Sequence, residues 1–120
     1  MPSGYRKALG RRGEDLACGH LEGLGFTIVE RNYRTARGEI DIVAGKAGLT
    51  VFVEVKARRS RLYGEPEEAV TPSKVRRLRS LAAEYLARKG GSGEVRFDVI
   101  SVTLDGDGNT TGLRHLPGAF

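Results

Sequence analysis

The chain has 120 residues, a formal net charge of +5, 39% hydrophobic residues and 29% charged residues. This length and composition predict one domain, residues 1–120, that buries its own core, and the single cysteine, Cys18, excludes an internal disulfide and the cysteine-rich zinc motifs. No apolar run reaches the roughly 20 residues of a membrane span and no signal-peptide core follows the basic start, so we expect a cytoplasmic protein without a membrane partner.

A first helix is predicted from about residue 10 to 25, where apolar residues recur at spacings of three and four. These residues are Ala17, Cys18, Leu21 and Leu24. Glu14 falls at the N-terminal edge of the same stripe, so its carboxylate is expected to face inward. Three strands are then predicted to form an antiparallel meander. They cover residues 26–34, 38–45 and 49–58.

Residues 59–70 are predicted to form a loop, because Gly64 and Pro66 break both the helix and the strand period. A second helix is expected over residues 72–89, with Thr71 as its N-cap and Pro72 at its first position. Its apolar face is formed by Val75, Leu78, Ala82, Tyr85 and Leu86. Strands at 95–105 and near 113–116 complete an αβββαββ order, which predicts an α/β or α+β fold with a mixed sheet.

Charged residues interrupt the second and third predicted strands. Alternation places Asp41 on one strand face with Glu39, and Glu54 on one face with Lys56. A four-residue hairpin loop, residues 46–49, would set Asp41 directly opposite Glu54 and Glu39 opposite Lys56. Like charges that face each other across two strands are destabilising, so buried carboxylates that converge there need a cation.

A hard divalent ion such as Mg²⁺ or Mn²⁺ fits this pattern, because Mg²⁺ is usually held by one or two carboxylates with water and substrate phosphate. Asp41 and Glu54 would supply the carboxylates and the Val55 carbonyl a third oxygen. Lys56 would orient the attacking water or stabilise charge on the phosphate. The alternative is a solvated sheet face on which Lys56 bridges the two carboxylates.

The same residues resemble a known group of enzymes. Asp41 and the run Glu54-Val55-Lys56, behind a helix that carries Glu14, resemble the PD-(D/E)XK nuclease superfamily, in particular archaeal Holliday-junction resolvases. The segments GRRGEDLA, RNYR, GEIDIVA, FVEVKAR, RFDVISV and PGAF are similar to the YraN-like family of small bacterial proteins. The resemblance implies a restriction-endonuclease-like fold, with Asp41 and Glu54 as metal ligands, Lys56 as the catalytic lysine and Glu14 as an acidic partner. Ile40 stands where the superfamily motif is named for proline.

Basic residues gather after the third predicted strand and at the start of the second helix. Phosphate contacts are expected from Arg58, Arg59, Arg61, Lys74 and Arg77. The alternative is a set of solvated faces, with Lys74 reaching out to water. A structural hydrogen bond is expected for Asp98, and surface or packing roles for His20 and His115.

We therefore expect a metal-dependent DNA endonuclease that hydrolyses phosphodiester bonds, with branched or junction DNA as the substrate that the resemblance implies. One alternative is a non-catalytic or partner-dependent nucleic-acid-binding module with the same fold, and a second is a structural or protein-interaction domain. Cutting a junction would be easier for a symmetric homodimer, although no segment of the sequence proves one.

Overall fold

The computed structural model describes the backbone of residues 3–59, 70–91 and 93–120, and side chains from residue 9 onward within these ranges. The elements follow the predicted αβββαββ order. They are α1 (Ser3–Gly23), β1 (Thr27–Thr35), β2 (Gly38–Lys46), β3 (Leu49–Arg58), α2 (Pro72–Lys89), β4 (Glu94–Leu104) and β5 (Thr110–Leu116). In the described part of the chain, no helix is both long and apolar enough to cross a membrane.

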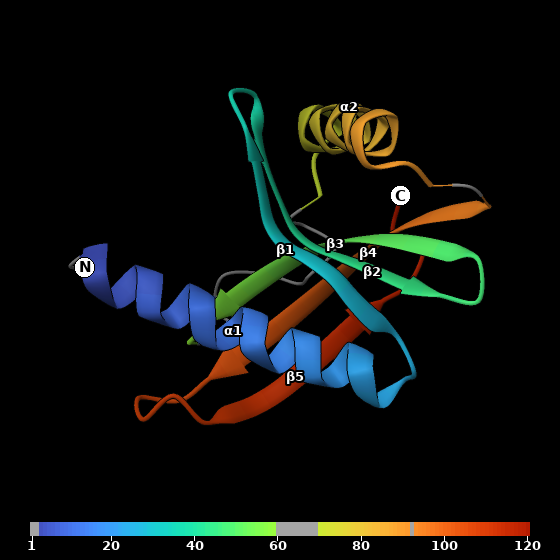
Figure 1. Ribbon diagram of the computed structural model, residues 1–120. Coiled ribbons are helices and arrows are strands. Elements are labelled where there is room, and N and C mark those ends of the chain that lie inside the picture. The colour runs from blue at the N-terminus through green and yellow to red at the C-terminus, as the bar shows by residue number, and fades with distance from the viewer. Residues whose placement is uncertain (1–2, 60–69, 92) are drawn as a thin grey trace.

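The five strands form one mixed sheet in the order β1-β2-β3-β4-β5. All neighbours are antiparallel except β3 and β4, which run parallel because the chain crosses back through α2 between them. The two helices cover opposite faces of the sheet (Figure 1). The predicted α+β fold with a mixed sheet is confirmed, and its arrangement is compatible with a restriction-endonuclease-like fold.

Helix α1 packs its apolar stripe on one face of the sheet, where Ala17, Cys18 and Leu21 are buried. It begins at Ser3, earlier than predicted, and its N-terminal end projects beyond the sheet (Figure 1). That projecting end has no sheet to cover, so it lacks the apolar periodicity on which the prediction relied. Leu24 was expected on the buried stripe but is 45% exposed, because the helix already ends at Gly23.

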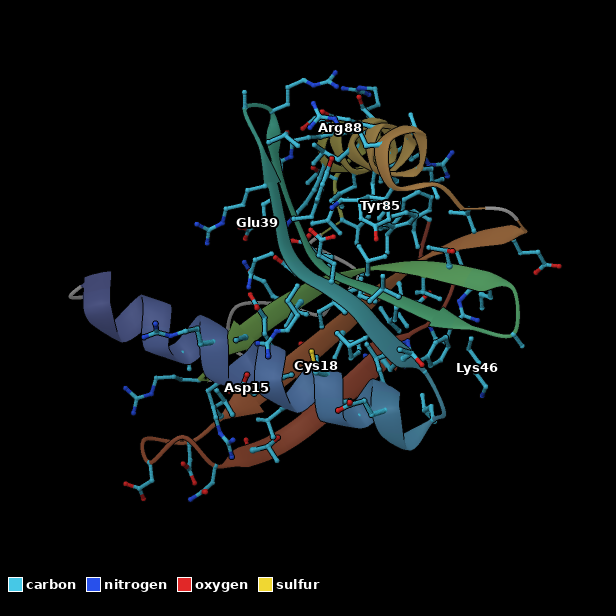
Figure 2. The ribbon with its side chains drawn as sticks, in the orientation of Figure 1. Asp15, Cys18, Glu39, Lys46, Tyr85 and Arg88 are labelled. Carbon is cyan, nitrogen blue, oxygen red and sulfur yellow. The ribbon has the colours of Figure 1, made fainter. Side chains whose placement is uncertain are left out.

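Helix α2 has the predicted bounds and the predicted cap. The Thr71 hydroxyl accepts a hydrogen bond from the Lys74 N–H at 3.2 Å, which satisfies one of the free donors of the first turn. Leu78, Leu81, Ala82 and Tyr85 are buried on the sheet-facing side. Tyr85 points from the helix toward the sheet (Figure 2), where its ring packs edge-on against Tyr33 and Phe52.

The β2–β3 hairpin closes with a two-residue turn, Ala47 and Gly48, instead of the predicted four-residue loop. Both residues have positive φ, 48° and 82°, as a type I′ turn requires. The predicted register is nevertheless correct, since Gly45 faces Thr50 and Ile42 faces Val53. Alanine is uncommon at positive φ, and Ala47 occupies the place of asparagine in the Asn-Gly signal that identifies such turns. The sequence therefore gave no sign of a two-residue turn.

The β1–β2 hairpin bends away from the rest of the sheet. Asn32 has a φ of 54°, a left-handed conformation that asparagine tolerates better than most residues. Strand alternation breaks nearby, because Ile40 and Val43 pack on the α2 side whereas Ile42 packs on the α1 side. The outer half of the hairpin then rises beside α2 (Figure 1), and Arg37 at its tip forms an ion pair with Glu84 at 3.3 Å.

Candidate functional site

The site begins where β2 parts from β3, a place that we call the fork. The β2–β3 pairing ends at Ile42 and Val53, while β3 continues beside β4 as far as Arg58. Asp41 is the first residue of β2 beyond that pairing. Its carboxylate accepts a hydrogen bond from the Val55 N–H at 2.7 Å and so replaces the backbone acceptor that the departing strand removes.

Two predicted strand pairs are therefore wrong. The β2–β3 ladder does not extend to Asp41 and Glu54, nor to Glu39 and Lys56. Glu39 instead faces Arg34 of β1 and forms an ion pair with it at 2.6 Å. The bend in the β1–β2 hairpin is the physical reason, because it carries Glu39 and Asp41 out of the plane of β3.

Asp41 is nevertheless electrostatically close to Glu54. Burial raises the pKa of Asp41 to about 8, and the negative charge of Glu54 adds to this effect. The Val55 N–H lowers the pKa, whereas Glu14 and Glu39 raise it further. The charged form of Asp41 is thus disfavoured at the fork, and a bound cation would favour it.

Glu54 lies on the α2 side of β3, the same strand face as Phe52. Its carboxylate forms an ion pair with the ammonium of Lys74 at 2.7 Å. Only 14% of the Glu54 side chain and 22% of the Lys74 side chain are exposed. Lys74 reaches the fork because α2 starts at Pro72, so the first turn of the helix lies at this end of the sheet. The sequence placed Lys74 near the site, but it gave no sign that Glu54 would be its partner.

Glu14 reaches the fork from α1 and faces inward as predicted, with 14% of its side chain exposed. The preceding residue, Gly13, makes this possible because a Cβ there would lie 2.6 Å from the Cβ of Ala57 on β3. Helix and strand therefore approach as closely as a glycine allows. Arg31 lies 3.5 Å from Glu14 and 2.8 Å from Asp15, so its stronger contact is with Asp15.

The predicted basic residues differ in their exposure. Lys56 is exposed on the strand face that it shares with Glu54, and Arg59 and Arg77 are also exposed. Arg58 is only 7% exposed, so its side chain would have to turn outward to contact DNA. Arg61 lies outside the described residues.

A divalent ion at the fork would have few side-chain ligands. Among the described residues, no three or more His, Cys, Asp or Glu side chains form a group that could hold a metal. Asp41, Glu54 and the Val55 carbonyl offer two carboxylates and one backbone oxygen, with water or phosphate needed for the remainder. That donor set fits the oxygen preference of Mg²⁺ and its habit of retaining water, and the raised pKa of Asp41 indicates a site in need of positive charge.

A buried polar network lies between β4, β5 and the end of α1. Asp98 is fully buried and accepts hydrogen bonds from Arg96 at 2.8 and 2.9 Å, from the Gly118 N–H at 3.0 Å and from His115 at 2.7 Å. His115 contacts His20 at 3.0 Å. Burial raises the pKa of Asp98, but Arg96, Gly118 and His115 hold it below its usual range. The predicted structural hydrogen bond of Asp98 is confirmed.

The sequence missed the pairing of the two histidines, because 95 positions separate them in the chain. Arg96 and Asp98 could have been paired from the sequence, since residues two apart share a strand face. All members of the network except His20 come from the C-terminal part of the chain. The network therefore ties α1 to the far edge of the sheet and lies apart from the contacts described at the fork.

The fold and the fork define a class: an α+β domain whose mixed five-stranded sheet lies between two helices and carries the carboxylates of Asp41 and Glu54 where two strands separate. Residues 13–102 match the model of a family described as "Uncharacterised protein family UPF0102". The chain belongs to this family, which confirms the predicted YraN-like membership.

Several UPF0102 proteins are similar to this chain over almost their whole length. The protein of Rhodococcus jostii is 47% identical over 117 residues, covering 97% of this chain and 98% of the relative. The protein of Geobacter sulfurreducens is 45% identical over 125 residues, covering 100% and 97%. The protein of Desulforamulus reducens is 43% identical over 118 residues, covering 96% and 97%. The match thus includes the segments that build the fork.

Proposed function

We propose that this protein is a metal-dependent DNA endonuclease whose active site is the fork. The observation that carries the proposal is the electrostatic coupling of Asp41 and Glu54 just beyond the end of the β2–β3 ladder, where burial and Glu54 raise the pKa of Asp41 to about 8. A structural role alone would be served better by a neutral side chain, because carboxylates crowded at a half-buried position are costly. Such crowding is typical of functional sites.

Asp41, Glu54 and the Val55 carbonyl are the proposed ligands of Mg²⁺ or Mn²⁺. Such an ion supplies Lewis acidity and neutralises charge on the phosphate when it is bound. Glu14 adds negative charge from the α1 side, and we assign it the role of acidic partner. Lys56, exposed on the same strand face as Glu54, would stabilise the charge that develops on the phosphate.

The proposed reaction is hydrolysis of a phosphodiester. The oxygen of a water molecule forms a bond to phosphorus, one ester P–O bond breaks, and the leaving oxygen takes up a proton to become a hydroxyl group. Arg59, Arg77 and Lys74 are proposed to hold neighbouring phosphates, together with Arg58 and Arg61. These contacts carry no sequence information, so we expect weak sequence preference.

The resemblance of the Asp41 and Glu54-Val55-Lys56 pattern to the PD-(D/E)XK superfamily supports the same reaction. Its similarity to Holliday-junction resolvases favours branched DNA as the substrate. A symmetric homodimer would place two forks on two strands of a junction. We place this activity in the cytoplasm.

Cleavage of linear, flap and four-way-junction DNA in Mg²⁺ or Mn²⁺ tests the proposal, with Asp41→Ala as the matched inactive variant. Cutting by the native protein and its loss in the variant are expected. Equal cutting by both would show that the nuclease activity does not come from the fork.

A second candidate is a DNA-binding module that uses the same fold without cleaving. The Lys74–Glu54 ion pair at 2.7 Å favours it, because a lysine already neutralises one of the proposed metal ligands. Salt-sensitive DNA binding with no cleavage in any metal would support this candidate.

A further inference from the structure

We infer that Lys74 is a resident cation of the fork: its ammonium neutralises Glu54 in the metal-free protein, and a divalent ion must displace it to bind. This inference rests on the proposed function, since it takes Glu54 to be a metal ligand. It assigns Lys74 a role that phosphate binding alone does not describe.

The geometry of the pair is the first reason. Lys74 Nζ lies 2.7 Å from Glu54 Oε1, with 22% and 14% of the side chains exposed. By contrast, Arg34 in its ion pair with Glu39 is 75% exposed. Exposed pairs exchange readily with water and are worth little. Shielding from water strengthens the attraction between Lys74 and Glu54, so a competing cation has to overcome it.

The position of Lys74 on its helix is the second reason. It lies in the first turn of α2, directly after the Thr71 cap and Pro72. The N-terminal end of a helix carries partial positive charge, which favours Asp or Glu there and disfavours lysine. No acidic residue occupies that first turn. The helix itself therefore gives no reason for a lysine at this place, whereas Glu54 of β3 does.

Competition follows from charge and from geometry together. The oxygen that accepts the Lys74 ammonium belongs to the carboxylate that would bind the metal, and two cations at one carboxylate repel each other. Loss of the lysine charge should therefore strengthen metal binding. A lysine that merely anchored α2 to the sheet would affect the stability of the fold and leave the metal affinity unchanged.

The test is calorimetric titration of Mn²⁺ into the DNA-free protein at pH 8, for the native chain and three variants. Lys74→Met removes the charge but keeps most of the aliphatic stem, and Arg76→Met removes an equal charge from an exposed position on the same helix. Glu54→Gln removes the proposed ligand. Thermal unfolding of each variant verifies that it is folded, and Lys74→Gln replaces Lys74→Met if the latter fails to fold.

We expect Lys74→Met to bind Mn²⁺ about fivefold more tightly than the native chain, Arg76→Met to remain within about twofold of it, and Glu54→Gln to lose the site. Lys74→Met with the affinity of Arg76→Met would overturn the inference and leave the metal site standing. No Mn²⁺ binding by the native chain, or binding that survives Glu54→Gln, would instead overturn the metal site of the proposed function.

Discussion

Asp41 is the residue at which stability and the proposed chemistry conflict most clearly. Its carboxylate completes the backbone hydrogen bonding of Val55, a task that any acceptor of similar shape could perform. Its charge is disfavoured by burial and by Glu54. Proteins commonly accept such a cost at sites where function requires it.

Asp41→Asn is expected to raise the free energy of unfolding by about 2 kcal/mol at pH 8, because a neutral amide keeps the acceptor and removes the disfavoured charge. The pKa of Asp41 in the folded chain, about 8, lies above its ordinary value of 3.8, so native stability decreases as the pH rises from about 4 to 8. The advantage of the variant should therefore be small near pH 4.5. Urea unfolding at both pH values measures it, and an advantage that does not change with pH would contradict the assigned cause.

The fork depends on how closely α1 approaches β3 and on how sharply the β1–β2 hairpin bends. Gly13 permits the first and Asn32, at a φ of 54°, the second. Hydrophobic periodicity predicts neither feature, because each depends on a single backbone position. The sequence could predict α2 and β3 to the residue, since a cap and an apolar face mark the helix and alternating valines mark the strand.

Gly13→Ala should destabilise the chain by about 1–3 kcal/mol, because the new Cβ would lie 2.6 Å from the Ala57 Cβ and would push α1 off the sheet. Gly19→Ala is the matched control on the same helix, since a Cβ there has no neighbour within 4 Å. That substitution should stabilise by up to about 1 kcal/mol through helix propensity. Thermal unfolding compares the stability of the two variants. Changes in stability of the same sign for both would show that the close contact between Gly13 and Ala57 does not restrict the residue at position 13.

The network between α1 and the far sheet edge should make stability depend on pH. Burial and His115 lower the pKa of His20 below its ordinary value of 6.5. The unfolded chain therefore binds a proton at this residue more readily than the folded chain, and the stability that His20 contributes is lost as the pH falls below about 6.5. Because Asp41 acts in the opposite direction, the measurement is the difference between the native chain and His20→Gln.

Urea unfolding of these two proteins at pH 7.5 and 5.5 should show the native chain losing stability relative to His20→Gln at the lower pH. Glutamine keeps a donor toward His115 but does not titrate. A constant difference at both pH values would show that His20 is not protonated selectively in the unfolded chain.

Across the whole molecule, the net charge of +5 and the 15 arginines would attract phosphate groups to the surface, as the proposed function requires. The sequence showed where basic residues cluster along the chain but not which are accessible. The fold buries Arg58, exposes Arg59 and directs Lys74 to Glu54. Exposure depends on how β3 ends and where α2 begins in space, which local patterns do not determine.

DNA affinity should fall steeply with salt. Arg59→Ala should reduce the slope of log affinity against log salt by about one, which corresponds to the loss of one phosphate contact. Arg88→Ala is a control, because Arg88 lies about 21 Å along α2 from Lys74 and pairs with Glu84. Binding of one duplex by anisotropy at four salt concentrations measures both slopes. An unchanged slope for Arg59→Ala would show that Arg59 does not contact the DNA phosphates.

In the proposed function, the carboxylates of the fork hold the metal and do not hold the DNA. The most direct measurement compares cleavage and binding of the same four-way junction by the native chain and by Glu54→Ala, with Mg²⁺ for cleavage and without metal for binding. We predict that the variant loses cleavage by at least about a hundredfold and keeps its DNA affinity within about threefold. Cleavage that survives the substitution would show that Glu54 is not a ligand of the catalytic metal.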